Sequence, residues 1–287
     1  MSFHPGHIPT RSLPGFAPGA AVAMLRLDLV DPVVSGNKWY KLKYNLELAK
    51  ASGHGTVLTF GGAYSNHLVA AAAAAQAAGL QSIGIVRGLQ NELTHTLQAC
   101  KTFGMQLQFV SYGTYKQKSA PEFLAQLAAF YHNPFIIPEG GANEAGRKGA
   151  GEIAAFINDT YTDVCVSAGT GTTLAGLRNV LPATQFITGF APMKGGSYLQ
   201  QEIMPFIDAG KRNAFRVTDK YHFGGFGKIT DTLIGFMQEF KTRYGFDLDR
   251  VYTAKMMYGL HDLLLQNAFS RDAKILCIHT GGVQGNS

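Results

Sequence analysis

Residues 163–181, with the sequence DVCVSAGTGTTLAGLRNVL, decide the fold class of this chain. They predict a buried strand over 163–167 and a helix over 172–181, joined by a glycine-rich turn. The turn reads Ser167-Ala168-Gly169-Thr170-Gly171-Thr172-Thr173. A strand that passes through such a turn into a helix is the unit of parallel α/β sheets, which bind ligands at the carboxyl ends of their strands.

The same alternation extends along the chain on both sides of this turn. Further strands are expected at 56–60, 82–86, 106–110, 135–137, 186–190, 215–218 and 274–279. Further helices are expected at 68–78, 93–103, 121–131, 149–158, 198–207, 231–244 and 254–267. This rhythm predicts an α/β protein with two open, mostly parallel twisted sheets and helices on both faces. Residues 1–40 with 141–287 are expected to form the larger domain, and residues 41–140 the smaller one.

Composition and charge narrow the class of protein. The 287 residues are 46% hydrophobic and 15% charged, which is typical of a compact enzyme rather than a disordered or fibrous chain. The net charge of +6 comes from scattered residues, so no nucleic-acid partner is expected. Cys100, Cys165 and Cys277 lack the spacing of a disulfide framework or a metal site. Without a signal-peptide core or a membrane-length apolar run, a soluble cytoplasmic protein with no membrane partner is expected.

The glycine-rich turn suits an anion. Its glycines let backbone amides approach a phosphate, and the N-terminus of the following helix favours negative charge. It lacks the GK[ST] of a Walker A loop, and Leu174 stands where GxGxxG has its third glycine. The alternative interpretation is a tight turn that only caps the helix.

A second stretch, Ser35-Gly36-Asn37-Lys38-Trp39-Tyr40-Lys41-Leu42, places two lysines where a helix is expected to begin. Lys38 and Lys41 are three residues apart and share one helical face. An amine near a helix N-terminus, with a second cation beside it, has its protonated form disfavoured, as a Schiff-base lysine requires. The alternative is a capped helix start with two solvated lysines, and the octet alone leaves both interpretations open.

Two further polar stretches adjoin predicted helices. Gly61-Gly62-Ala63-Tyr64-Ser65-Asn66-His67 follows a strand and precedes an alanine-rich helix. Its last three residues suit a carboxylate pocket, although they are also good capping residues. Tyr252 stands just before the helix at 254–267, where it is either an acid/base candidate or a core aromatic.

Together these motifs resemble one family. Ser-Gly-Asn-Lys, Gly-Gly-x-x-Ser-Asn-His, Gly-Thr-Gly-Thr-Thr and Val-Tyr-Thr-x-Lys occur in its order and approximate spacing. The chain is similar to pyridoxal-phosphate (PLP) enzymes of the tryptophan-synthase β group, fold type II. Within that group it resembles the 1-aminocyclopropane-1-carboxylate deaminase and D-cysteine desulfhydrase family, from about Leu25 to Asn286.

The resemblance implies a role for each matching residue. Lys38 matches the lysine that binds the cofactor aldehyde and later moves the α-proton of the substrate. Asn66 matches the asparagine at the ring oxygen, and Thr253 stands where the pyridine nitrogen finds its partner. Ser65 and Tyr252 match catalytic and substrate-binding positions, and Asn66 and His67 lie with them. The phosphate-binding positions are matched by Lys41, Gly169, Thr170, Gly171, Thr172 and Thr173.

Two positions separate activities within the resembled family. The deaminases carry a glutamate after the tyrosine, which keeps the pyridine nitrogen protonated. This chain has the neutral hydroxyl of Thr253, as the desulfhydrase-type members do. A second active-site tyrosine of the deaminases aligns with Phe223, and Tyr221 is the alternative source of that hydroxyl. Both departures favour β-elimination over opening of a cyclopropane ring.

The predicted function is therefore PLP-dependent α,β-elimination from a small amino acid by a lyase. The best substrate is D-cysteine, converted to pyruvate, sulfide and ammonia. Alternatives with the same fold are the cyclopropane-acid deaminase, which is a hydrolase, an amino-acid racemase and a dehydratase. A non-catalytic module that binds a phosphorylated metabolite is the alternative from another class. The resemblance also implies a homodimer.

Overall fold

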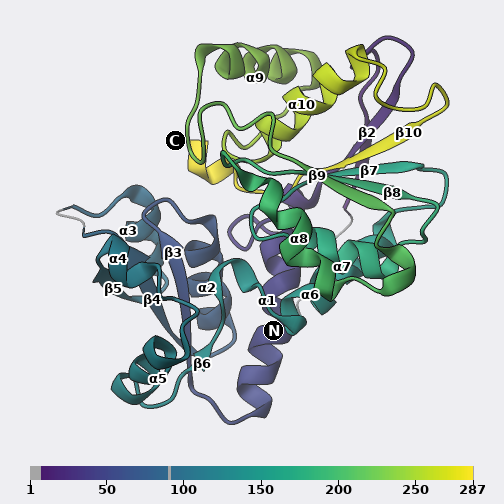
Figure 1. Cartoon of the computed structure of the whole chain (residues 1–287). Helices are drawn as coiled ribbons and strands as arrows, with labels where there is room; N and C mark the ends of the chain where they lie inside the picture. Colours follow the sequence, from purple (N-terminus) through teal and green to yellow (C-terminus); the bar gives the residue numbers. More distant parts are fainter. Residues whose placement is uncertain (1–7, 90–91, 287) are drawn as a thin grey trace. The chain divides into compact units, whose positions relative to one another are not determined.

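Two compact units make up the chain in the computed structural model, which describes residues 8–89 and 92–286 (Figure 1). The larger unit contains 8–30, 35–37 and 150–286 of these, and the smaller contains 31–34 and 38–149. The short segment Ser35–Asn37 thus belongs to the larger unit, while its neighbours on both sides belong to the smaller. The domain boundaries at residues 40 and 140 stay a prediction. The two ends of the predicted larger domain, residues 1–7 and 287, lie outside the described residues.

Within the described residues, the larger unit is built on a six-stranded sheet with the order β1-β2-β10-β7-β8-β9. Only β1 is antiparallel, to β2; the other neighbours are parallel. The strands are β1 (Thr10–Ser12), β2 (Ala21–Leu25), β7 (Asp163–Ser167), β8 (Phe186–Phe190), β9 (Phe215–Thr218) and β10 (Lys274–Ile278). β2, close to the N-terminus, thus lies beside β10, the last strand of the chain.

Helices cover both faces of the six-stranded sheet (Figure 1). One face is covered by α9 (Asp231–Tyr244) and α10 (Thr253–Leu265), the other by α7 (Thr172–Val180) and α8 (Leu199–Ile203). The main core lies under α9 and α10, where Met256 and Leu260 pack with Cys165 and Cys277 of the central strands. Because both faces are covered, β7 and β10 are buried along almost their whole length instead of alternating.

The smaller unit has a four-stranded parallel sheet with the order β5-β4-β3-β6 in the part of the chain that is described. Its strands are β3 (Thr56–Gly62), β4 (Gln81–Arg87), β5 (Gln106–Val110) and β6 (Phe135–Ile136). Its helices are α1 (Asn37–Ala51), α2 (Asn66–Ala77), α3 (His95–Thr102), α4 (Tyr112–Tyr115), α5 (Pro121–Phe130) and α6 (Glu144–Gly151), of which α1 and α6 each extend into the larger unit. The prediction of two mostly parallel sheets with helices is confirmed.

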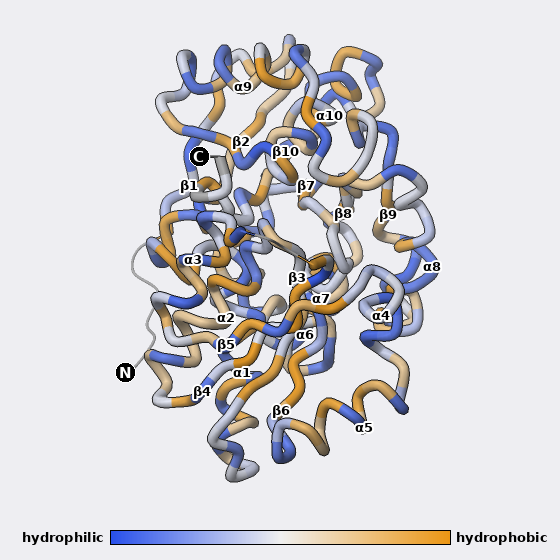
Figure 2. The backbone as a smooth tube through the Cα atoms, turned by 90° about the vertical axis from the view of Figure 1, so that its left-hand side faces the viewer, coloured by the Kyte–Doolittle hydropathy of each residue, from blue (hydrophilic) through white to orange (hydrophobic). Residues whose placement is uncertain are grey.

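Amphipathic patterning explains why the outer helices form where they do. Figure 2 shows hydrophilic and hydrophobic residues alternating along α9. Leu233 and Phe240, seven positions apart, are buried in the core, while charged residues of α9 are exposed. Thr230 begins the helix by accepting a hydrogen bond from the Leu233 amide, and Gly245 ends it in a left-handed conformation.

Two helices differ from the sequence-based expectation. The helix predicted at 149–158 begins at Glu144, because the Asn143 side chain caps it by accepting from the Gly146 amide at 2.9 Å. The helix predicted at 198–207 is regular only over Leu199–Ile203. Pro205 has no amide proton to continue it, so the chain tightens into a 3-10 turn at Met204–Phe206.

Arg178, which is fully buried on α7, provides a test of how the larger unit is held together. Its guanidinium donates to the carbonyls of Leu181, Pro182, Gln185 and Ala214, and the last two immediately precede β8 and β9. We expect Arg178→Met to leave these carbonyls without donors and to lower the free energy of unfolding by about 3 kcal/mol or more. Denaturant unfolding measures this loss. The exposed Arg271→Met is the control, and equal stability of the two variants would contradict the assignment.

Candidate active site

The glycine-rich turn lies at the carboxyl end of β7 and leads directly into α7. Gly171 has a φ of 70° and a Cβ here would overlap the Ile203 side chain, so only glycine fits. The hydroxyls of Thr170 and Thr172 share a hydrogen bond of 2.7 Å. Since the first amides of a helix have no partner within it, the turn presents donors to a ligand at this end of α7.

Two buried polar atoms beside this turn lack a hydrogen-bond partner within the described residues. They are Ser167 Oγ, at the end of β7, and Asn37 Oδ1. The side-chain nitrogen Nδ2 of the same Asn37 donates to Thr173 Oγ1 at 2.8 Å, and this hydrogen bond connects Asn37 to the turn. Buried polar atoms without partners are uncommon in folded proteins, so these two indicate a polar ligand at the turn.

The segment Ser35–Asn37 is anchored to the larger unit on several sides. The Ser35 hydroxyl donates to the Asp28 carbonyl at 3.1 Å, and the Asn37 amide donates to the Thr280 carbonyl at 3.4 Å. Gly36 has a φ of 68°, and a Cβ would overlap the Thr280 carbonyl. Lys38 is the next residue in the chain, so the residue that precedes it, Asn37, is fixed within the larger unit.

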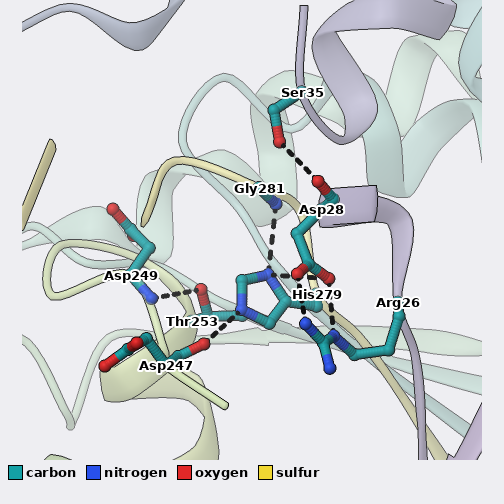
Figure 3. A network of polar contacts seen from close by, with 8 residues as sticks. All are labelled: Arg26, Asp28, Ser35, Asp247, Asp249, Thr253, His279 and Gly281. Carbon is teal, nitrogen blue, oxygen red and sulfur yellow. Dashed lines mark hydrogen bonds and ion pairs between the residues drawn. The ribbon is translucent and has the colours of Figure 1, made fainter. Parts of the chain in front are cut away.

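A buried network supports this segment from below (Figure 3). Arg26 Nε and Nη2 donate to the two carboxylate oxygens of Asp28 at 2.8 and 2.6 Å. The guanidinium also stacks on Phe246, 3.8 Å from the ring centre. Both charged side chains are more than nine-tenths buried, a setting in which a bidentate ion pair is held in one geometry.

His279 joins the network at the end of β10. Its Nε2 lies 2.9 Å from the Asp247 carbonyl, which only accepts, so Nε2 carries the proton. Its Nδ1 accepts from the Gly281 amide at 3.3 Å and lies 3.7 Å from Asp28 Oδ1. These partners assign the neutral Nε2–H tautomer. Through the same two hydrogen bonds the ring links the 279–281 turn to Asp247, in the segment before α10.

Thr253, the first residue of α10, is fully buried. Its hydroxyl oxygen accepts from the Asp249 amide at 3.2 Å, as Figure 3 shows. Asp249 Oδ1 in turn accepts from the Tyr252 amide at 2.6 Å and caps the helix. Because Thr253 accepts in this bond, its own proton is left to be donated.

Tyr252 lies over the glycine-rich turn. A Cβ on Gly169 would be 3.2 Å from the Tyr252 ring and 3.6 Å from its hydroxyl, so these two predicted site residues are brought together. The ring of Phe226 meets Tyr252 edge-on at 5.8 Å, and Phe226 is 48% exposed. The motif comparison missed Phe226. The signal in the sequence was an aromatic residue between two glycines, Gly225 and Gly227.

Phe223 and Tyr221, the two residues considered for a second active-site aromatic, both have partners in the larger unit. Phe223 packs on Tyr258 with ring centres 4.9 Å apart, against the core under α9 and α10. The Tyr221 hydroxyl donates to Asp262 at 2.7 Å, and burial together with this bond raises its pKa. Of the three aromatic residues at 221–226, Phe226 is the one whose ring meets Tyr252.

In the smaller unit, Lys38 and Lys41 lie on the first turn of α1. Lys41 is only 7% exposed, and burial followed by the charge of Lys38 lowers its pKa to about 7. The alternative of two solvated lysines is wrong for Lys41. A buried amine with a lowered pKa favours an anionic partner, because an anion restores the protonated form.

Ser65, Asn66 and His67 occupy the start of α2 in the same unit. Ser65 Oγ accepts from the Leu68 amide at 3.3 Å and so caps the helix. Capping uses a lone pair of the oxygen and leaves the hydroxyl proton to donate. The capping and binding interpretations of Ser65 are therefore compatible.

His67 is a neutral acceptor. Thr59 Oγ1 donates to the Ile137 carbonyl and lies 2.9 Å from His67 Nε2, so Nε2 carries the proton. Nδ1 is then a buried acceptor without a partner among the described residues. Burial, Lys41 and Lys38 together lower the pKa of His67 to about 3, so it is not an acid or base near neutral pH.

The predicted site residues thus gather in two sets. Gly169–Thr173, Tyr252 and Thr253 lie in the larger unit, and Lys38, Lys41 and 65–67 in the smaller. Over the described residues no group of three or more histidine, cysteine or acidic side chains is placed to hold a metal ion. In the same residues no helix has both the length and the apolar character to cross a membrane.

Comparison with known proteins identifies the family of this chain. The family model described as pyridoxal-phosphate dependent enzyme matches residues 1–281. The chain belongs to this family. A relative from Pyrococcus horikoshii, named "Putative 1-aminocyclopropane-1-carboxylate deaminase", is 33% identical over 98% of the chain and 91% of its own length. A relative from Pyrococcus furiosus with the same name is 30% identical over 98% and 91%.

Solved structures agree with this assignment. A crystal structure described as the ACC deaminase homologue superposes with a TM-score of 0.85 and 32% identity, covering 100% of this chain and 92% of that one. A hydrogen sulfide-producing enzyme from Fusobacterium nucleatum has a TM-score of 0.71 and 14% identity, over 98% and 97% of the two chains. At that identity the second likeness concerns the fold alone.

The cofactor of this family is pyridoxal phosphate, and the residues present fit it. The glycine-rich turn, with its helix N-terminus and the two buried polar atoms without partners, suits the phosphate. Lys41, in the smaller unit, suits an anionic group, because its lowered pKa would recover beside one. The Thr253 hydroxyl, which accepts from the Asp249 amide, has its proton to donate to a polar ligand.

The lowered pKa of Lys41 predicts how stability depends on pH in the cofactor-free protein. Between about pH 7 and 10.5 the unfolded chain keeps the Lys41 proton and the folded chain does not, so raising the pH stabilises the fold. Lys41→Met should lose this contribution. The wild-type melting temperature should therefore rise relative to that of the variant between about pH 6.5 and 9.5. Lys50→Met, exposed on the same helix, is the control, and a pH-independent difference between wild type and Lys41→Met would contradict the burial of this amine.

Proposed function

We propose that this enzyme catalyses α,β-elimination from a small amino acid, with D-cysteine as the substrate. Cysteine and one water become pyruvate, hydrogen sulfide and ammonia. The observation that carries the proposal is Thr253, a buried neutral hydroxyl that accepts from the Asp249 amide and so has its proton to donate. A neutral ring nitrogen suits a reaction in which a leaving group removes the electron pair from the substrate.

The chain's own residues divide the work of this reaction. The bound cofactor supplies the sink for electrons from the α-carbon. Lys38 is the amine that holds the cofactor and takes the α-proton, and the phosphate is held by Lys41 and the turn at 169–173. The Ser65 hydroxyl and the free amides at the start of α2 bind the substrate carboxylate. Asn66 is assigned to the ring oxygen, and Tyr252 and Phe226 to the substrate side chain.

Deamination of 1-aminocyclopropane-1-carboxylate is the second candidate, because both Pyrococcus relatives carry that name. The absence of a hydroxyl on Phe223, which aligns with a second active-site tyrosine of the deaminases, and the neutral Thr253 favour elimination over this reaction. A homodimer and a cytoplasmic location, both taken from the sequence, complete the proposal. Light scattering coupled to size exclusion tests the dimer.

The covalent link to Lys38 is tested by colour. Purified or cofactor-reconstituted protein should be yellow, and borohydride should remove the visible band by reducing the carbon–nitrogen double bond to Lys38. Lys38→Ala should lack the band while Lys43→Ala, on the same helix, keeps it. A colourless wild type that pyridoxal phosphate cannot reconstitute would contradict the assignment.

The substrate is tested by release of sulfide. D-Cysteine should give sulfide and pyruvate faster than D-serine gives pyruvate, and the cyclopropane acid should give no 2-oxobutanoate. Thr253→Val, which has the same shape without the hydroxyl, should lower kcat/KM about tenfold or more, whereas Thr253→Ser retains activity. Absence of sulfide from D-cysteine, with turnover of the cyclopropane acid, would replace the first candidate by the second.

A further inference from the structure

Lys255 is a buried cation for which the proposed reaction has no use. It lies on α10, three residues after Tyr252, and is 2% exposed. Its Nζ donates to the carbonyls of His222 and Gly225, both at 2.9 Å, and of Pro192 at 3.3 Å. The three protons of an ammonium thus meet three main-chain oxygens from two separate segments.

The charge of Lys255 persists at neutral pH. Burial lowers its pKa to about 8, and the nearby carboxylate of Asp249 acts in the opposite direction. A buried ammonium is retained only where its donors are satisfied, and here backbone carbonyls satisfy them. Such a ring of carbonyl oxygens is also the coordination that a potassium ion accepts.

The segment around Lys255 is strained. In the turn formed by residues 221–227, Phe223 has a φ of 51°, Gly224 of 91° and Gly225 of 132°. A positive φ is unusual for a bulky residue such as Phe223, and it persists only where the surroundings hold it. Two of the three carbonyls that Lys255 binds, those of His222 and Gly225, flank Phe223 and Gly224.

We propose that Lys255 is a positioning residue, an internal monovalent cation around which the 221–227 turn folds so that Phe226 meets Tyr252. Its effect on catalysis rests on the proposed function, but its effect on the turn does not. Since carbonyls that lose their cation repel one another, removing the side chain frees the turn. Lys255→Ala leaves space among the carbonyls, and potassium or ammonium ions from solution then restore the order of the turn.

Hydrogen–deuterium exchange of the peptides spanning 219–229 tests the ordering directly in the purified enzyme. Lys255→Met and Lys255→Ala should exchange these amides about tenfold or more faster than wild type. Lys220→Ala, an exposed lysine just before the turn, is the matched control and should exchange as wild type does. Potassium chloride should slow exchange in Lys255→Ala but not in Lys255→Met, whose side chain fills the space, and tetramethylammonium chloride should act on neither.

Unchanged exchange in Lys255→Met would overturn the proposal, as would equal effects of potassium and tetramethylammonium on Lys255→Ala. Lys255→Gln, an amide with two protons and no charge, covers the case in which the alanine variant does not fold, and its exchange should be intermediate. In the sulfide assay, Lys255→Ala should raise KM while the visible band at Lys38 persists, with potassium reversing the change. A wild type without that band would contradict the proposed function, but the exchange result would still report on the ordering of the 221–227 turn by Lys255.

Discussion

The bidentate pair between Arg26 and Asp28 is the interaction on which the candidate site depends. It fixes Asp28, whose carbonyl receives the Ser35 hydroxyl and whose carboxylate stands near His279. Gly36 packs against the Thr280 carbonyl, and the main-chain amide of Asn37 donates to it. The side chain of Asn37 donates to Thr173 of the glycine-rich turn. A buried pair contributes little net stability, because desolvation offsets most of its attraction. Its contribution here is to geometry, since it places the peptide that precedes Lys38.

Two buried lysines, Lys255 and Lys41, have different surroundings and are assigned different roles. Lys255 has its three donors satisfied by carbonyls, and its pKa stays near 8. Lys41 lies close to another amine, and its pKa falls to about 7. Burial lowers both pKa values; the charge of Lys38 lowers that of Lys41 further, whereas the carboxylate of Asp249 opposes the fall at Lys255. The first arrangement is complete in the protein alone, whereas the second favours an anionic ligand.

Sequence patterns predicted most of the architecture and proposed the residues of the candidate site. The strand–turn–helix at 163–181 and the regular alternation around it are local features, so they indicated parallel sheets correctly. The sequence left open whether Phe223 or Tyr221 faces the substrate, and it did not indicate Phe226 as the ring beside Tyr252. All three aromatic residues lie in one glycine-rich stretch, and only the left-handed path of the chain there decides which ring turns toward Tyr252 and which enters the core.

The sequence by itself determined the fold class, the family and its cofactor, because these rest on periodicity and on motifs of adjacent residues. The tertiary structure decided what depends on distant partners. It made Lys41 a buried amine and His67 a neutral acceptor, and it gave Lys255 its carbonyls. Burial and the field of neighbouring charges set these states, and both come from residues far apart in the chain, so no local pattern of amino acids contains them.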